Sequence, residues 1–339
     1  MSRCKLEEFI SYEQPAKYIV DSDQYDDSYE IPVLTAGKSF ILGYTDEKNN
    51  IFDNLPVIIF DDFTTSVQFV DFQFKVKSSA MKLLKNTEQA DIKYCYYLLK
   101  FLQHTPENHK RQWLSATSQN TVELPAIEEQ KNIVKKLDKI LEVIDNQNKQ
   151  MELLDEAIKA RFVEMFGEIE DCDRWKSKIW NEVVTIQNGR DYKKVLVNDG
   201  GYPVVGTGGE IARASGYLCP ENTIVVGRKG SINNPMLMKE KFWNVDTAFG
   251  VIPNSDYLHY QYFYYFCKFY NFMKLNKATT LPSTTKADLL KIRINIPPLE
   301  LQNQFASFVQ EIDKSRSRIQ KSLEASQELF DSLMQEYFG

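Results

Sequence analysis

The chain has 339 residues, of which 43% are hydrophobic and 26% charged, and this length and composition fit a globular protein of two domains. A net charge of −6 argues against a generally basic nucleic-acid binder, and five cysteines without a Cys-x-x-Cys spacing indicate neither a disulfide framework nor a zinc ribbon. The apolar runs are too short to span a bilayer and the first residues, MSRCKLEEF, lack the apolar core of a signal peptide, so a cytoplasmic location is expected.

Residues 1–122 have the pattern of a β-rich domain. Three runs of apolar residues end in polar loops, as short buried strands do: IPVLTAG (31–37), LPVIIFDD (55–62) and VQFVDFQFKV (67–76). The aromatic segment DIKYCYYLLKF (91–101) that follows them is typical of a helix packed on such strands.

Residues 123–167 have the pattern of one long helix. Proline precedes it, acidic residues fill its first turn, and no proline interrupts it. From Glu128 to Phe166 such a helix is roughly 58 Å long. Its apolar positions step by four and three, as in a coiled coil: Ile133, Leu137, Ile140, Ile144, Met151, Leu154 and Ile158, with Gln147 and Arg161 as polar interruptions.

Residues 168–294 repeat the order of the first domain. YPVVGTGG (202–209), NTIVVGRKGS (222–231) and FWNVDTAFGVI (242–252) correspond to its three predicted strands, and HYQYFYYFCKF (259–269) corresponds to its aromatic helix. With Tyr94 set against Tyr262, four further positions of this helix are identical. The duplication therefore covers a whole half of the chain.

Residues 295–339 repeat the long helix. A shift of 172 residues aligns 123–167 with 295–339 without a gap and gives ten identities over 45 positions, including Pro125/Pro297 and Gln130/Gln302. The apolar positions of the second copy are Phe305, Val309, Ile312, Ile319, Leu323 and Phe330, with Arg316 and Ser326 as interruptions.

The interruptions fall at different heptad positions in the two copies. We therefore expect the helices to pair with each other, antiparallel, with flanking positions such as Phe162, Met165, Met334 and Phe338 free to bind other subunits. The alternative is an ordinary amphipathic helix packed on its own domain.

Charge and loop chemistry distinguish the two domains. Residues 174–294 carry 17 basic and 9 acidic side chains, whereas residues 1–122 carry 13 basic and 17 acidic. The loop after the central strand is DDFTTS (61–66) in the first half and GRKGSINN (227–234) in the second. Arg and Lys pair with guanine, Asn with adenine, carboxylates with the cytosine amine, and Thr with the thymine methyl group. Two unlike loops on one scaffold predict two DNA-recognition modules, although both could be solvated turns.

The candidate DNA-contacting residues lie in these loops and in neighbouring polar segments. They are Thr35, Lys38, Asp62, Thr64, Thr65, Ser66, Thr207, Arg213, Arg228, Lys229, Ser231, Asn233, Asn234, Thr284 and Lys286.

Catalytic motifs are incomplete throughout the sequence. GTGG (206–209) is not a full dinucleotide-binding loop, and VIIFDD (57–62) has no accompanying phosphate-binding loop. His104, His109 and Cys95 lack the tight spacing of metal ligands, and no nucleophile, base and orienting group can be combined. The sequence therefore does not predict an enzyme or a metal site.

The first globular domain ends in Pro-Ala-Ile-Glu-Glu-Gln (125–130) and a long heptad helix. The second domain likewise ends in Pro-Pro-Leu-Glu-Leu-Gln (297–302) and a second helix. This arrangement resembles the specificity (S) subunits of Type I restriction–modification systems. The closing Glu-Met-Phe-Gly (164–167) and Glu-Tyr-Phe-Gly (336–339) and the segment from Trp175 to Arg190 also resemble that family.

The resemblance implies an α+β fold with an internal pseudo-twofold repeat and an antiparallel coiled coil. Its parts would be target recognition domains at 1–122 and 168–294 and spacer helices at 123–167 and 295–339. It implies a non-catalytic subunit that reads a bipartite double-stranded DNA target. Two methyltransferase (M) subunits, which bind S-adenosylmethionine and methylate adenine, and restriction (R) subunits would be its partners.

The sequence departs from the family pattern in one segment, and it leaves one alternative function open. The segment 113–121 is short, which suggests that the first domain lacks an edge element. A structural adaptor, with two domains held apart by a coil and no DNA contact, is the alternative function.

Overall fold

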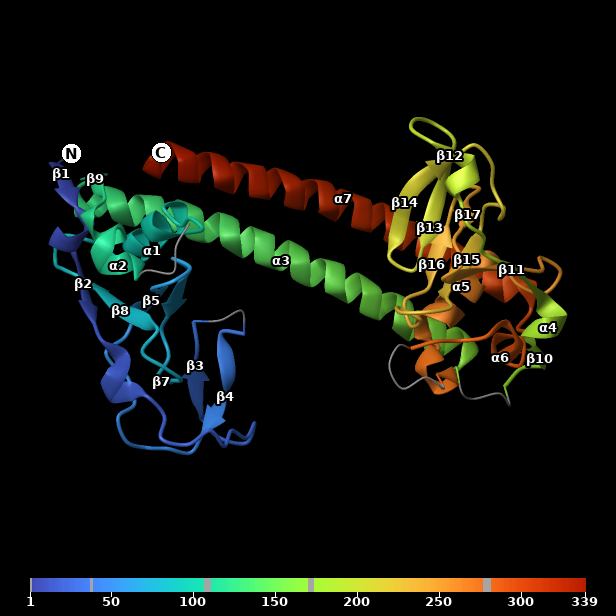
Figure 1. Cartoon of the computed structure of the whole chain (residues 1–339), viewed down its shortest axis with the longest axis horizontal. Helices are drawn as coiled ribbons and strands as arrows, with labels where there is room; N and C mark the ends of the chain where they lie inside the picture. The colour runs from blue at the N-terminus through green and yellow to red at the C-terminus, as the bar shows by residue number, and fades with distance from the viewer. Residues whose placement is uncertain (1, 37–38, 107–110, 170–173, 277–281) are drawn as a thin grey trace. The chain divides into compact units, whose positions relative to one another are not determined.

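The computed structural model describes residues 2–36, 39–106, 111–169, 174–276 and 282–339, which fold into two compact units. The first unit is Met1–Gln147 with Ser322–Gly339, and the second is Asn148–Lys321. Each unit therefore contains one globular domain, part of the long helix that precedes or follows it, and part of the other long helix (Figure 1).

The first unit has nine strands and short helical segments before its long helix. The strands are β1 (Ser2–Lys5), β2 (Ile10–Glu13), β3 (Ile31–Leu34), β4 (Ile41–Thr45), β5 (Val57–Asp61), β6 (Val67–Val70), β7 (Lys75–Val76), β8 (Met81–Asn86) and β9 (Thr121–Leu124). The helices are η1 (Leu6–Glu8), η2 (Pro15–Tyr18), α1 (Ile92–Phe101), α2 (Gln112–Ser115), η3 (Thr117–Gln119) and α3 (Ile127–Phe166).

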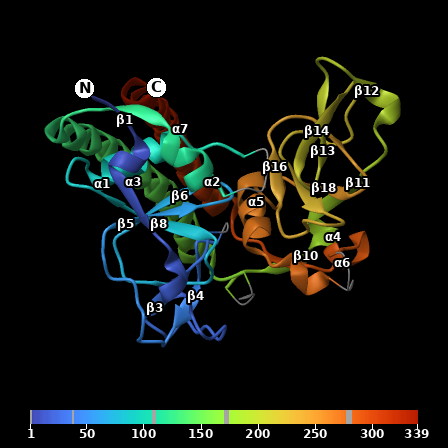
Figure 2. The same cartoon turned by 60° about the vertical axis from the view of Figure 1, so that its left-hand side comes forward.

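Three sheets make up the first domain. A four-stranded sheet has the order β2-β8-β5-β6, a three-stranded sheet has the order β4-β3-β7, and β1 pairs with β9. The central strand β5 is buried at all five positions, as its apolar sequence predicts. Helix α1 packs on the four-stranded sheet and contributes Tyr94, Tyr97 and Leu98 to one core with the start of α3 (Figure 2).

The second unit continues the chain with ten strands. They are β10 (Ser177–Ile179), β11 (Val184–Asn188), β12 (Leu196–Val197), β13 (Tyr202–Gly206), β14 (Gly209–Ala214), β15 (Thr223–Gly227), β16 (Met236–Met238), β17 (Trp243–Asn244), β18 (Ala248–Pro253) and β19 (Arg293–Asn295). The helices are α4 (Trp180–Val183), η4 (Lys193–Val195), α5 (Tyr260–Phe269), η5 (Phe272–Leu275), α6 (Lys286–Leu289) and α7 (Leu299–Phe338).

The second domain has the sheet topology of the first. Its sheets have the orders β11-β18-β15-β16 and β12-β14-β13-β17, and β10 pairs with β19. Both domains also contain the same parallel pair, β3 with β7 and β13 with β17, within otherwise antiparallel sheets. The duplication inferred from sequence is thus confirmed, with one difference: strand β12, which pairs with β14 in the second domain, has no counterpart beside β4 among the described residues of the first.

The two long helices pack antiparallel within each unit. In the first unit the start of α3, at Ile133 and Leu137, shares a core with Phe330 and Met334 near the end of α7. In the second unit the end of α3 at Phe162 packs edge-on against Phe305 near the start of α7, at a ring-centroid distance of 5.5 Å. The predicted pairing of the two helices is confirmed by these contacts.

The positions of the predicted apolar stripe face inward to different degrees. Buried positions are Ile133, Leu137, Ile158, Phe305, Val309 and Phe330, and half-buried positions are Ile140, Ile144, Met151, Leu154, Ile312, Ile319 and Leu323. Gln147 is also buried, and its Nε2 donates to Ser322 Oγ at 2.7 Å. A polar pair inside an apolar stripe favours one register of the two helices over others.

The expectation that flanking apolar residues of the helices remain free for partner subunits is wrong for the residues named. Phe162, Met165 and Met334 are buried, and Phe338 packs on Tyr94 at a ring-centroid distance of 5.3 Å. They complete the cores of the domains because each domain closes onto the helix ends.

The glutamine of the repeated Pro-x-x-Glu-x-Gln motif is buried and hydrogen-bonded in both units. Gln302 Oε1 accepts from His259 N at 2.7 Å, and its Nε2 donates to Tyr257 O and Pro297 O. Gln130 makes the same three bonds in the first unit, with Asp91 N, Gln89 O and Pro125 O. One amide side chain thus joins the start of a long helix to the loop that begins the aromatic helix of its own domain.

The expectation that the first domain lacks an edge element is also wrong. Strand β9 pairs with β1 over four residues, and the short helix α2 precedes it, as α6 precedes β19 in the second domain. Trp113 of α2 is buried against Phe60 and anchors this element to the domain.

The helices of the described part of the chain include none that is long and apolar enough to cross a membrane.

Replacement of Gln302 by Met is expected to destabilise the second unit by on the order of 3 kcal/mol. The change keeps the volume of the side chain but leaves the buried partners of the amide without hydrogen bonds. Denaturant unfolding measures the loss, with the same change at exposed Gln304 as the control. Equal stabilities of the two variants would contradict the role given to Gln302.

Candidate nucleic-acid interface

A basic loop follows the central strand β15 of the second unit. Arg228 and Lys229 are both exposed, and the Arg228 guanidinium carbon lies 5.9 Å from the centroid of the Phe249 ring. Arg228 Nη1 also donates to Asp246 O at 3.4 Å. These contacts orient the side chain at the surface, so Arg228 is placed as a base-contacting or phosphate-contacting cation has to be.

A second segment holds this loop in place. Arg228 O accepts from Thr284 N at 3.0 Å, Gly230 N donates to Pro282 O at 2.9 Å, and Lys229 forms an isolated bridge with Ser283. Gly230 has φ +81, a conformation that glycine adopts without strain. These hydrogen bonds therefore hold the backbone of the loop in place and fix the positions from which its side chains project.

Thr207, Ser231, Asn233 and Asn234 belong to the same loop region. Ser231, Asn233 and Asn234 are exposed, and Thr207 lies beside Gly230, where an added Cβ would be 4.0 Å from its Oγ1. These residues come from the loops after two different strands, β13 and β15.

Three other candidate DNA-contacting residues of this unit have side chains that are engaged in other contacts. Thr284 was expected to contact DNA, but it is 3% exposed and its hydroxyl donates to Gly227 O at 2.8 Å, so it supports the loop from inside. Lys286 Nζ donates to Ile186 O at 2.7 Å. Arg213 lies opposite Pro203, at the other end of the β13–β14 hairpin from Thr207, and pairs with Glu210.

Arg190 is an exposed cation that the list of candidates omitted. It follows Gly189, where a Cβ would lie 1.8 Å from Val245 O, so the chain can approach the 244–245 segment only with glycine there. Arg190 N donates to Asn244 O at 3.0 Å, and two residues later Asp246 O accepts from Arg228. The Asn-Gly-Arg sequence at 188–190, at the end of strand β11, was the signal that could have found it.

The corresponding loop of the first unit faces inward at two of its expected residues. Asp62 is 1% exposed and its Oδ2 lies 3.0 Å from Lys82 Nζ, while its Oδ1 accepts from Trp113 N at 2.9 Å. Thr65 is 2% exposed and bonds to the backbone of His104. Asp62 and Thr65 were expected to contact bases, but both side chains are buried and bound to other protein groups in this structure.

An open groove with a volume of about 1070 Å³ lies beside this loop. Its lining includes three expected residues, Thr35, Thr64 and Ser66, whereas Lys38 lies outside the described residues. Side chains that were not expected also line it, namely Ser78, Lys100, Gln103, His104 and Thr105. These hydroxyl, amide, imidazole and ammonium groups offer the donors and acceptors that base edges and phosphates bind.

Asp62 and Arg228 occupy the same place in the two domains. Each is the first residue after the central strand, and the backbone oxygen of each accepts from the segment before the last strand, from Gln112 N or Thr284 N. The neighbouring strand in the sheet, β8 or β18, supplies the residue that contacts it, Lys82 in one case and Phe249 in the other. One domain therefore pairs a carboxylate with a buried lysine where the other exposes an arginine over an aromatic ring.

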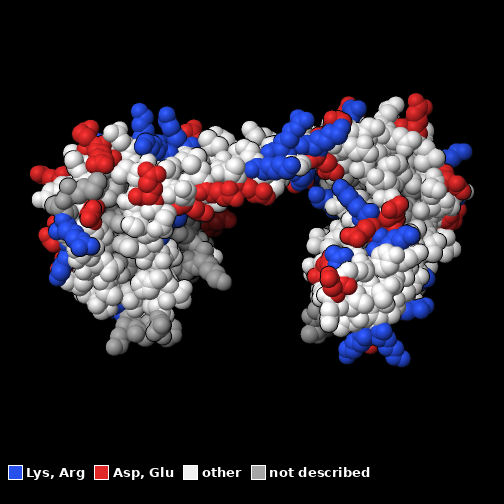
Figure 3. Space-filling model, turned by 90° about the horizontal axis from the view of Figure 1, so that it is seen from above, with Lys and Arg blue, Asp and Glu red and all other residues white. Residues whose placement is uncertain are grey.

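Charge is distributed in groups on both units. On the face shown in Figure 3, clusters of Lys and Arg alternate with clusters of Asp and Glu, so neither unit is uniformly basic there. In the second unit Arg316 Nη2 donates to Asp155 Oδ1 at 2.8 Å between the helices, which lowers the pKa of Asp155. Contacts with phosphates would therefore come from local cations such as the Arg228 loop.

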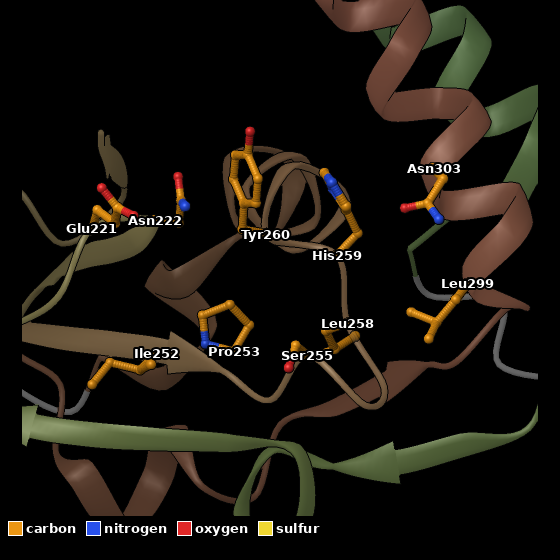
Figure 4. Close-up of a pocket in the computed structure, with 10 residues that line it drawn as sticks. All are labelled: Glu221, Asn222, Ile252, Pro253, Ser255, Leu258, His259, Tyr260, Leu299 and Asn303. Atoms are coloured by element: carbon orange, nitrogen blue, oxygen red, sulfur yellow. The ribbon is translucent and has the colours of Figure 1, made fainter. Parts of the chain in front are cut away.

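A smaller pocket of about 330 Å³ lies near the junction of α5 and α7 (Figure 4). Its lining includes His259 and Tyr260 from the start of α5 and Leu299 and Asn303 from the start of α7. Burial lowers the pKa of His259, and its Nδ1 accepts from Gln261 N, so the ring is neutral near pH 7. Its described lining includes no expected DNA-contacting residue, so this pocket is separate from the basic loop.

Buried thiols add little chemistry to either unit. Burial raises the pKa of Cys219 to about 12 and raises the pKa of Cys95 and Cys267 as well, so these thiols are protonated core groups. Among the described residues, no cluster of three His, Cys, Asp or Glu side chains could hold a metal ion.

Comparison with known proteins gives a family for the second half of the chain. Residues 173–327 match the family described as Type I restriction modification DNA specificity domain. The specificity subunit of the Type I restriction enzyme EcoR124I/EcoR124II of Escherichia coli is 51% identical over 126 residues, which are 35% of this chain and 31% of that protein. The match thus spans about a third of the length of this curated relative.

Solved structures extend the likeness of fold to the whole chain. The S subunit of a Type I restriction-modification system from M. genitalium superposes with a TM-score of 0.67 at 15% identity, covering 100% of this chain and 96% of that one. A chain from a structure that describes complex assembly in the type I R-M system has a TM-score of 0.52 at 16% identity and covers 99% of both. At these identities the likeness establishes the fold.

Replacement of Lys82 by Met is expected to destabilise the first unit by about 3–5 kcal/mol, because it leaves the buried Asp62 carboxylate without its cation. The double change Asp62→Asn and Lys82→Met should recover part of the loss. Denaturant unfolding checks both, with Lys178→Met as the control. Lys178 pairs with Glu182 at the surface, where a change of less than about 1 kcal/mol is expected. Similar losses for Lys82→Met and Lys178→Met would contradict the role of the buried pair.

Proposed function

We propose that the chain is the sequence-specific DNA-binding subunit of a Type I restriction–modification complex and that it reads a bipartite target with one half-site for each domain. The observation that carries the proposal is the repetition of one domain fold with unlike polar groups at the same place, Arg228 in one and the Asp62–Lys82 pair in the other. The match of residues 173–327 to a DNA specificity domain supports it.

The chemistry of the complex belongs to other subunits in this proposal. The chain supplies recognition, whereas two M subunits with bound S-adenosylmethionine methylate adenine, and R subunits cut DNA. Val143 and Leu329 in the first unit and Leu153 in the second are exposed apolar side chains on the long helices, which makes each a candidate contact for such subunits. A protein that reads the DNA of its own cell acts in the cytoplasm.

A structural adaptor without DNA contact remains the second candidate, favoured by the net charge of −6. A gel-shift with mixed-sequence duplexes, with and without an M subunit, separates the two functions. The proposed function requires sequence-specific binding by the assembled complex.

Arg228→Ala is expected to relax specificity at one base position, with a loss of about 1–3 kcal/mol of discrimination there. Its guanidinium is exposed and held over Phe249, so its removal should not disturb the core. Sequencing of methylated sites in a host that expresses the complex measures the change, with Lys178→Ala as the control cation. An unchanged motif and unchanged methylation rate in Arg228→Ala would remove Arg228 from the interface.

Insertion of four residues after Gln147 and four after Lys321 is expected to lengthen the unread spacer of the target by roughly one to two base pairs. Gln147 bonds to Ser322, so the two insertions lie side by side and extend both helices by about 6 Å. Methylation sequencing should show both half-site sequences unchanged. Altered half-sites with an unchanged spacer would contradict the helices as a ruler.

A further inference from the structure

In the first unit, a buried threonine ties the loop after the central strand to the segment after the aromatic helix. Thr65 Oγ1 accepts from His104 N at 3.0 Å and donates to His104 O at 2.7 Å. Both backbone groups of residue 104 are thus bound by one side chain.

The same tie recurs in the second unit with a different side chain. Asn233 Oδ1 accepts from Phe272 N at 2.8 Å. In both units the side chain follows the central strand, and the amide that it binds lies 39 residues later, after the aromatic helix. Thr in the first unit and Asn in the second therefore make equivalent hydrogen bonds between the same two segments of the repeat.

Thr65 makes these hydrogen bonds from a strained backbone conformation. Its φ is +57, which is rare and strained for a β-branched residue. Asp61 holds the turn around it, since its Oδ1 accepts from Phe63 N and its Oδ2 from Thr64 Oγ1. These bonds also satisfy the Asp61 carboxylate, which is 6% exposed and so presents little charge to a phosphate.

The segment held by the tie presents polar side chains to the groove. Gln103, His104 and Thr105 line it together with Thr64, Ser66 and Lys100. In the second unit the segment after α5 likewise exposes Asn271 and Lys274, on either side of the buried Phe272. In each domain two loops thus meet, and one side chain fixes their relative position.

We propose that Thr65 and Asn233 are positioning residues for DNA recognition, and that the segments they hold, at Gln103–Thr105 and Asn271–Lys274, contact the half-site of their own domain. This inference rests on the proposed function and deepens it. It assigns base discrimination in the first domain to the groove and not to the inward-facing Asp62.

The test is methylation sequencing of the assembled complex with paired variants. Thr65→Val removes the hydroxyl and keeps the shape of the side chain, whereas Thr65→Ser keeps the hydroxyl. Asn233→Leu and Asn233→Asp form the matching pair in the other domain. We expect Thr65→Val to reduce discrimination about tenfold at one half-site only, Asn233→Leu to do so at the other only, and the Ser and Asp variants to retain the motif.

The untouched half-site is the internal control for folding and assembly. Loss of methylation at all sites alike, or no change in either half-site, would show that the ties serve stability alone and overturn the inference. If Thr65→Val does not assemble, exposed Gln103→Ala decides, since an unchanged half-site there also overturns it. A wild-type complex that methylates no bipartite motif refutes the proposed function instead.

Discussion

A buried amide at the start of each long helix joins the helix to its domain, and the architecture of both halves depends on it. Gln130 and Gln302 are both fully buried, and each binds one backbone amide and two backbone carbonyls from two segments. No apolar side chain can satisfy three such groups at once. The helix direction, the start of the aromatic helix and the proline turn are therefore fixed together, in the same way in both units.

Because this joint is independent of the loops at the ends of the central strands, those loops can differ without loss of the fold. The first domain uses the position after its central strand for a buried ion pair, Asp62 with Lys82, which also anchors Trp113. The second uses the same position for Arg228, an exposed cation over Phe249. Two domains with one topology thereby present different chemistry, which is what recognition of two unlike half-sites requires.

The sequence predicted the repeat, both long helices and their antiparallel pairing, because these depend on periodicity and on segments that can be aligned. It did not predict which loop residues face outward. Asp62 and Thr65 follow a strand and look like a polar turn, but their partners Lys82, Trp113 and His104 lie 20 to 51 residues further along the chain and become neighbours only in the fold. The groove was missed for the same reason, since it is made by loops that no local pattern connects.

In the pair of long helices, apolar packing provides stability and polar contacts specify the register. Apolar stripes alone can pack in several registers, each shifted by one heptad. The Gln147–Ser322 bond is made in one register only, and it leaves Gln147 Oε1 buried without a described partner, so the pair gives up some stability. Asp155 adds a second constraint, because it lies 2.8 Å from Arg316 and 3.4 Å from Lys268 of the second domain. A shift of one helix along the other would separate both sets of partners at once, so these polar contacts select the register that the apolar stripe leaves open.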